Sequence, residues 1–212
     1  MECVLIHGMG RTPVSMLVLQ HRLRRAGHRV HLLGYLPTLD TLDAVSMRLQ
    51  RLLATRVQAK PYVLVGHSLG SVIIRYTVAQ LSSQRPAACF LLAPPMIACR
   101  AAKYFSQFFL FRWLTGEMGK LLAQEAFMQQ LPVPENTTIY AGIGGPRVAW
   151  LPFGKSLNDG ILSLEEACGD GRSSVLEFSC GHTFIMNSRA VCENMLTALN
   201  KLEEQKIKSS SV

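Results

Sequence analysis

A serine between two glycines, Ser68, is the residue of this chain best placed for covalent chemistry. It lies in Gly66-His67-Ser68-Leu69-Gly70, after an apolar run at 62–65 and before a helical pattern that reaches about residue 81. The G-x-S-x-G spacing is typical of a tight strand-to-helix turn that exposes the serine hydroxyl, with glycines where a Cβ would block the approach of strand and helix. Such a hydroxyl can attack a carbonyl carbon, and the amide of Leu69 is free to donate to the oxyanion that forms. The alternative is a glycine-flanked serine that only caps the helix.

The predicted base for this serine is a histidine late in the chain. A serine needs a base within hydrogen-bond reach to attack at neutral pH, and a third group to orient that base. Of the six histidines, His182 lies after the last predicted strand, in a loop preceded by a glycine. His7 and His67 flank the predicted site, and we interpret both as residues that shape its turns. Cys180 is an alternative nucleophile, but it lacks the turn that surrounds the serine.

The predicted acid is Asp159. It must lie between the nucleophile and the base and beyond the fifth predicted strand, because the chain order in this arrangement is serine, acid, histidine. Asp159 meets both conditions, in a turn that we expect to be exposed, while Asp170 and the pair Glu165-Glu166 are alternatives. We favour Asp159 over Asp170 because Asp170 lies nearer the end of its strand opposite the carboxyl edge, where such sites form.

A parallel sheet is the element that would bring these side chains together. Apolar runs suited to buried strands alternate with amphipathic helical patterns. Each connection is too long for a hairpin, which favours right-handed crossovers. The predicted strands are 2–6, 29–33, 62–65, 88–92, 137–141 and 174–178, and the predicted helices are 15–26, 39–57, 188–202 and one from behind Ser68 to about residue 81.

The chain is long enough for one well-buried domain. It has 212 residues, 49% of them hydrophobic and 17% charged, which indicates a compact core. We predict one domain over residues 1–205 and a polar, frayed tail at 206–212. Residues 94–131 are a possible insertion, because six aromatic residues fall between 104 and 113. This segment is either a lid or acyl-pocket wall over the site, or an ordinary core helix.

The charge balance is positive, with 22 Lys and Arg against 14 Asp and Glu and a net charge of +8. The arginines cluster at helical spacing in 22–29 and 48–56, which indicates either solvated helix faces or a peripheral contact with an anionic membrane. No nucleic-acid motif accompanies them, so no nucleic-acid partner is expected. No apolar run reaches the ~18 residues of a membrane span and no signal-peptide pattern follows Met1, so we expect a cytoplasmic protein. The cysteines and histidines lack ligand spacing, so neither a metal nor a cofactor is expected.

Four segments together carry a resemblance: VLIHGMG at the first predicted strand, GHSLG after the third, NDGILS before the sixth and GHTFIMN after it. Over nearly its whole length the chain resembles the serine α/β-hydrolases of the compact lipase and esterase kind. It is similar also to the lipase-like domains that deacylate lipid-linked glycans. The resemblance implies an α/β-hydrolase fold: about six parallel strands in the order 2-1-3-4-5-6 with helices on both faces.

The resemblance also implies the roles of the site residues. They are a triad and an oxyanion hole formed by two backbone amides, namely Ser68, Asp159 and His182 with the amides of Met9 and Leu69. The sequence after the fourth strand, Pro94-Pro95 followed by Met96, departs from the polar, glycine-containing loop of related sequences. The acyl pocket of the family is therefore not carried over.

The expected activity is hydrolysis of a carboxylic (acyl) ester, in a small molecule or a lipid, through an acyl-enzyme intermediate. Two alternatives use the same fold. One is transfer of the acyl group to an alcohol or amine by the same triad, and the other is a binding protein without catalysis.

Overall fold

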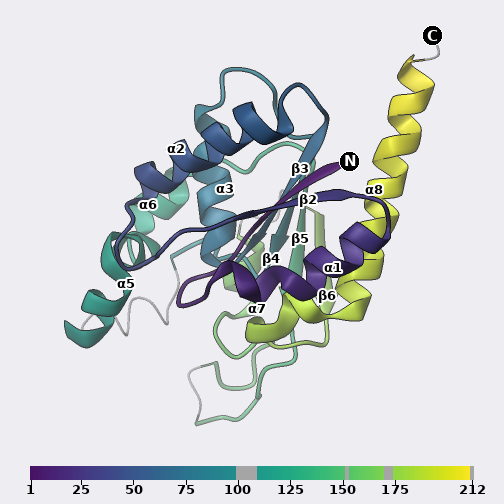
Figure 1. Cartoon of the computed structure of the whole chain (residues 1–212). Coiled ribbons are helices and arrows are strands. Elements are labelled where there is room, and N and C mark those ends of the chain that lie inside the picture. Colours follow the sequence, from purple (N-terminus) through teal and green to yellow (C-terminus); the bar gives the residue numbers. More distant parts are fainter. Residues whose placement is uncertain (99–108, 151–152, 170–173, 211–212) are drawn as a thin grey trace.

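One parallel sheet forms the centre of the molecule (Figure 1). The computed structural model describes residues 1–98, 109–150, 153–169 and 174–210. The strands are β1 (Glu2–Ile6), β2 (Arg29–Leu33), β3 (Tyr62–His67), β4 (Ala88–Leu92), β5 (Thr137–Gly142) and β6 (Ser174–Phe178). Neighbouring strands are all parallel and follow the order β2-β1-β3-β4-β5-β6, which confirms the predicted order 2-1-3-4-5-6.

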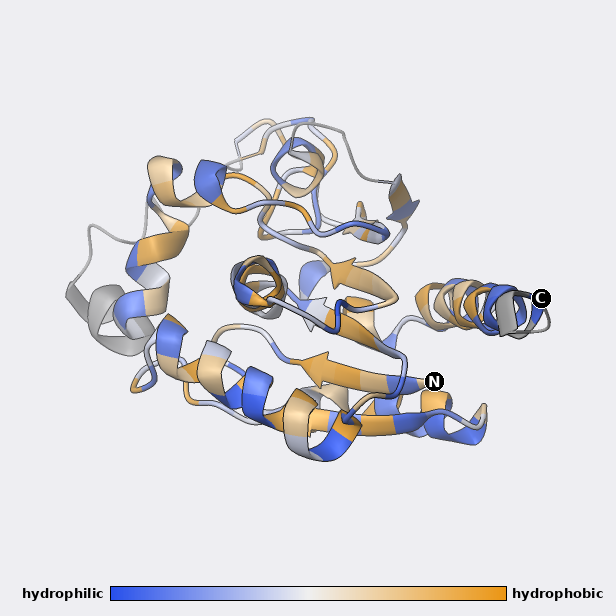
Figure 2. Cartoon of the chain, turned by 90° about the horizontal axis from the view of Figure 1, so that it is seen from above, coloured by the Kyte–Doolittle hydropathy of each residue, from blue (hydrophilic) through white to orange (hydrophobic). Residues whose placement is uncertain are grey.

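Helices cover both faces of this sheet. They are η1 (Pro13–Met16), α1 (Leu17–Arg25), α2 (Leu42–Leu52), η2 (Leu53–Val57), α3 (Leu69–Gln80), α5 (Phe109–Leu122), α6 (Glu125–Gln130), α7 (Leu164–Cys168), η3 (His182–Asn187) and α8 (Arg189–Ser210). Side chains that alternate along β1 enter two separate cores. Val4 and Ile6 pack with residues of α2, α3 and α6, whereas Cys3 and Leu5 pack with residues of α1 and α8. Residues on both faces of β1 are therefore apolar, and most of the strand ribbons have the hydrophobic colour in Figure 2.

The second helix begins later than its apolar spacing predicted. α2 begins at Leu42, because the hydroxyl of Thr41 accepts the amide of Ala44 at 3.2 Å and so caps the helix there. Leu39, which the periodicity had assigned to the helix, is 79% exposed in the preceding connection. The helix then continues as the π-helical turn η2 to Val57.

The last helix extends beyond its predicted end. α8 reaches Ser210, so the segment 206–210, predicted as a polar tail, is helical. No glycine or proline interrupts residues 189–210, and Glu204 and Lys208 have the i,i+4 spacing that supports an exposed helix. Within the described residues, no helix combines the length and the hydropathy that crossing a bilayer requires.

Part of the predicted insertion, 99–108, lies outside the described residues, and so do three of its six clustered aromatic residues, Tyr104, Phe105 and Phe108. The remainder forms α5 and α6, which precede β5. Gly116 interrupts α5 with a φ of 58°, at a point where an added Cβ would lie 2.7 Å from the carbonyl oxygen of Thr38. The insertion therefore packs against the connection between β2 and α2.

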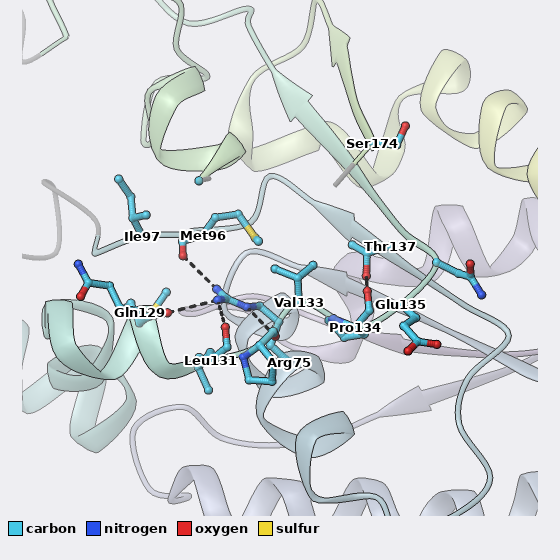
Figure 3. Close-up of a pocket in the computed structure, with 14 residues that line it drawn as sticks. Arg75, Met96, Ile97, Gln129, Leu131, Val133, Pro134, Glu135, Thr137 and Ser174 are labelled. Carbon is cyan, nitrogen blue, oxygen red and sulfur yellow. Dashed lines mark hydrogen bonds between the residues drawn. The ribbon is translucent and has the colours of Figure 1, made fainter. Parts of the chain in front are cut away.

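The buried side chain of Arg75 in α3 ties the insertion to the core (Figure 3). Its guanidinium donates to four backbone carbonyl oxygens, those of Met96, Met128, Leu131 and Pro132. A cavity of about 610 Å³ lies beside it, below the connection between α6 and β5. None of the predicted catalytic residues lines this cavity, so we interpret Arg75 as a structural anchor.

Candidate active site

Ser68 occupies the turn between β3 and α3 in a conformation that few non-glycine residues adopt. Its φ is 51° and its ψ is −115°. The turn is held because the Ser68 amide donates to the carbonyl oxygen of Leu92 at 2.9 Å. A Cβ on Gly66 would lie 2.6 Å from the amide nitrogen of Ser71, and one on Gly70 would lie 2.8 Å from the carbonyl oxygen of His7. Both glycines of the motif are thus required for β1, β3 and α3 to approach one another.

The turn after β1 packs directly on the serine turn. A Cβ on Gly8 would lie 2.7 Å from Nδ1 of His67, so only a glycine fits there. The ring of His7 stacks on Tyr35 with centroids 4.2 Å apart, and the Tyr35 hydroxyl donates to the His7 carbonyl at 2.7 Å. These contacts fix the backbone just before Met9, the residue whose amide the resemblance assigns to the oxyanion hole.

The described residues place an acid and a base together at the carboxyl ends of β5 and β6. His182 Nδ1 lies 2.7 Å from Oδ2 of Asp159, and the His182 amide donates to the Asp159 carbonyl at 2.9 Å. The other carboxylate oxygen accepts the amides of Ile161 at 2.9 Å and Leu162 at 2.7 Å. Because the ionised carboxylate only accepts, the proton lies on Nδ1, which leaves Nε2 of the neutral ring as an acceptor.

The tip of the turn after Asp159 is exposed at Gly160 and Ile161, but Asp159 itself is only 5% accessible. Asn158 and Ser163 form an antiparallel bridge that closes the turn, and Gly160 permits it with a φ of 96°. The side-chain oxygen of Asn158 accepts the amide of Gly160 at 2.9 Å. The carboxylate is therefore held inside the protein, facing the loop of His182.

His67 connects this acid-base pair to the serine turn. Its Nε2 lies 3.0 Å from the carbonyl oxygen of His182, so Nε2 carries the proton and donates. The two imidazole rings lie 5.1 Å apart at an angle of 54°. Burial, followed by the nearby His182 ring, lowers the pKa of His67 well below its usual value. The His67 ring is therefore neutral, and its Nδ1 is buried without a partner.

The five predicted site residues are thus distributed over one edge of the sheet. Asp159 and His182 are in direct contact, and His182 touches the residue before Ser68. Among the described residues, the Ser68 hydroxyl makes no hydrogen bond with His182. The amide of Leu69 is the first of α3 and so has no acceptor within the helix.

The alternative residues have other environments. Cys180 is half-buried, and burial, together with the charge of Asp159, raises the pKa of its thiol, which disfavours the reactive thiolate. Glu166 forms a capping box with Ser163 at the start of α7, and Asp170 lies outside the described residues. Within the described ranges, no three His, Cys, Asp or Glu side chains are grouped as metal ligands would be.

Tyr35 and Asn158 were not identified as site residues from the sequence. Asn158 is fully buried and its amide group donates to the carbonyl oxygens of Pro146 and Ser156. The Asn-Asp-Gly order, typical of a turn in which a side chain bonds the backbone, was the available signal for Asn158. Tyr35 follows β2 with no local motif, so its stacking on His7 depends on the pairing of β1 with β2.

Comparisons with known proteins agree with this architecture. Residues 3–192 match the model of the Alpha/beta hydrolase family, and the chain therefore belongs to that family. A metagenomic carboxyl esterase, MGS0156, superposes with a TM-score of 0.74 at 17% identity, covering 97% of this chain and 76% of the esterase. No curated protein sequence matches the chain.

Two further structures show the same fold. The ydeN gene product of B. subtilis superposes with a TM-score of 0.65 at 16% identity, covering 93% of this chain and 97% of its own. A putative lipase of Acinetobacter baumannii has a TM-score of 0.59 at 18% identity, covering 96% and 85%. These similarities show the α/β-hydrolase fold over nearly the whole chain.

Proposed function

We propose that this hydrolase cleaves carboxylic (acyl) esters with Ser68 as nucleophile, His182 as base and Asp159 as the residue that orients the base. The observation that carries the proposal is the hydrogen bond between His182 and a buried Asp159 whose second oxygen is occupied by two amides. That pair lies against the turn on which Ser68 adopts a positive φ. A carboxyl esterase and a putative lipase among the structural neighbours favour an ester as substrate.

The proposed reaction proceeds through an acyl-enzyme. The Ser68 Oγ bonds to the carbonyl carbon of the ester, and its proton passes to Nε2 of His182. The tetrahedral intermediate then loses the alcohol, which takes the proton from His182, and leaves an acyl-serine. Water repeats the sequence, giving its proton to His182 and releasing the acid, with Ser68 protonated again. Throughout, Asp159 keeps the Nδ1 proton in place and stabilises the imidazolium.

The charge that develops on the carbonyl oxygen needs donors. We assign this role to the amides of Leu69 and Met9. Leu69 lies at the N-terminus of α3, a 12-residue helix, where an unsatisfied amide and the helix dipole both favour negative charge. Met9 follows Gly8, whose close approach to His67 fixes the turn.

The first experiment tests the nucleophile. We expect a fluorophosphonate probe to label the wild-type chain and not Ser68→Ala, and p-nitrophenyl ester hydrolysis to be lost in that variant because no other serine has the activated turn. Cys180→Ala is the matched control, since it alters the alternative nucleophile two residues from His182 and should keep both labelling and turnover. Labelling that persists in Ser68→Ala, or that is lost in Cys180→Ala, would contradict the proposal.

A second experiment separates hydrolysis from acyl transfer. Both begin with the same acyl-serine, and they differ in whether water or an added alcohol or amine releases the acyl group. We expect the free acid as the main product when a primary alcohol is added in excess. Quantitative formation of the new ester would assign the chain to acyl transfer.

A further inference from the structure

The large apolar side chains that remain exposed are concentrated in the connections that follow the carboxyl ends of the strands. Eleven are exposed among the described residues, and all but Met47 of α2 lie in a connection that follows the carboxyl end of a strand or in the first helical turns after it. The connections at the amino ends of the strands contribute none in the described ranges. Chance placement would distribute such residues over both edges.

We define an apolar rim by Val14, Leu39, Trp150, Ile161 and Phe184, which lie in the connections that follow the carboxyl ends of β1, β2, β5 and β6. The most exposed members are Trp150 at 82%, Leu39 at 79%, Val14 at 67% and Phe184 at 64%. Ile161 follows Asp159 by two residues and Phe184 follows His182 by two. Trp150, Ile161 and Phe184 thus lie on the connections that carry Asp159 and His182. Val14 lies on the connection that carries Met9.

In the turn after β1 and in residues 143–158 of the connection after β5, the charged side chains are basic: Arg11 is half-buried, and Arg147 and Lys155 are exposed. Arg11 lies over the ring of Phe184 at 5.9 Å, and so joins the turn after β1 to η3. Arg147 and Lys155 lie in the long connection after β5, on either side of Trp150. Two carboxylates of the connections that form the rim are engaged: Asp40 accepts two hydrogen bonds from Arg48, and Asp159 is buried against His182.

We propose that the apolar rim docks on a bilayer surface that contains anionic phospholipid. Exposed aromatic and aliphatic side chains flanked by Arg and Lys are the combination that inserts at the boundary between headgroups and acyl chains. Basic side chains near an anionic leaflet add attraction that weakens with salt. A second copy of the chain fits less well, because two such rims would bring Arg11, Arg147 and Lys155 against their own copies.

The orientation has a consequence for the substrate, and this part rests on the proposed function. A docked rim directs Ser68 and His182 at the membrane, so the accessible esters are those of lipids rather than of dissolved molecules. Docking itself does not require catalysis. It can therefore be measured on Ser68→Ala, which separates failure of docking from failure of the proposed chemistry.

The test uses Trp150 as a reporter. The chain has two tryptophans, so Trp113→Phe in the Ser68→Ala background leaves Trp150 alone. Vesicles of phosphatidylcholine, with and without phosphatidylserine, are added, and emission and co-sedimentation are recorded. We expect a blue shift, quenching by brominated acyl chains, and binding that increases with phosphatidylserine and decreases with salt. Absence of binding to both kinds of vesicle would overturn the proposal.

Variants locate the contact. Leu39→Ser and Phe184→Ser should each weaken vesicle binding about fivefold or more, because each removes an inserted apolar side chain. Arg147→Gln should weaken binding to the anionic vesicles about fivefold and leave binding to phosphatidylcholine unchanged. Met47→Ser is the matched control, because Met47 is 63% exposed but lies on α2 outside the rim. Equal loss in Met47→Ser would contradict the proposal, as would concentration-dependent dimers that Phe184→Ser abolishes.

Discussion

The two edges of the sheet are both polar, but their polar groups are satisfied differently. At the amino edge, the carboxylate of Glu2 lies 2.7 Å from Nε2 of His31 and within 4 Å of Arg29 and Lys60. The amino group of Met1 donates to Glu203 at 2.6 Å. These groups are charged, and their partners reach solvent.

At the carboxyl edge, the buried polar groups include two neutral imidazoles, those of His7 and His67, besides the carboxylate of Asp159. Burial lowers the pKa of His7 and, more strongly, that of His67. Each ring has one nitrogen sealed from solvent without a partner, Nε2 of His7 and Nδ1 of His67. Unsatisfied buried polar atoms are costly, and the amino edge also has one, Nε2 of His28. The carboxyl edge differs in holding two of them beside a strained serine, which indicates that it is shaped for chemistry rather than for stability.

Of the changes at the two edges, a substitution of Asp159 should have the largest effect on kcat. Asp159→Asn should lower kcat about 10⁴-fold, because an amide can no longer hold the proton on Nδ1 of His182. The measurement is ester turnover with the fold checked by circular dichroism. Asp170→Asn is the control that the sequence offers, and it should retain activity; the reverse result would assign the acid to Asp170.

A smaller effect on kcat is expected from Gly8, which lies in the turn after β1 and packs against the turn of Ser68. Gly8→Ala should lower kcat about 10²-fold, because its Cβ would displace the His67 ring and with it the loop of His182. Gly34→Ala is the matched control, since its Cβ would meet only Pro13 at an ordinary 3.5 Å. Comparable activity in both alanine variants would show that the carboxyl edge tolerates rearrangement as readily as its surroundings.

The amino edge should respond in stability alone. Glu2→Gln keeps the hydrogen-bonding shape next to His31 but removes the charge, so we expect a loss of about 1 kcal/mol in the free energy of unfolding. Urea titration measures this change, and kcat should be unaltered. A loss of activity without a loss of stability would remove the distinction between the edges.

The smallest effect concerns pH. Because the pKa of His67 is lowered in the folded protein, the unfolded chain binds a proton first as the pH falls below about 6.5, and stability decreases there. The pKa values of His7 and His28 are lowered as well, so they add to the same trend. We expect the midpoint of thermal unfolding to fall with pH less steeply in His67→Gln than in the wild type. His21→Gln, on the exposed side of α1, should retain the wild-type slope.

The strands could be predicted because a strand buried on both faces leaves a continuous apolar run, as in residues 2–6. Their order was predicted as well, through four motifs that resemble one family. The end of α8 was predicted too early. The polar composition of 203–210 indicated a tail, and the i,i+4 pairs that support a helix there are a weak signal. Burial of Asp159 was missed because it depends on the bridge between Asn158 and Ser163, which brings the turn back onto the protein.

The site could be predicted only in part, for a related reason. Gly66 and Gly70 belong to the G-x-S-x-G motif, so the close backbone approach that they permit could be predicted from the sequence. The contact between His67 and the His182 carbonyl joins residues 115 positions apart. No local pattern marks such a contact, and neither does one mark the stacking of His7 on Tyr35.

The hydrogen bonds of Arg75 suggest how the segment 96–132 can change its sequence while it stays attached to the core. Its four acceptors are main-chain oxygens, which every amino acid supplies, and they lie at the beginning and the end of the segment 96–132. The sequence between these acceptors can therefore change as a unit, provided that the backbone at both ends keeps its position relative to Arg75. Over evolution, this segment could be replaced while the sheet and the loops of Ser68, Asp159 and His182 stay as they are.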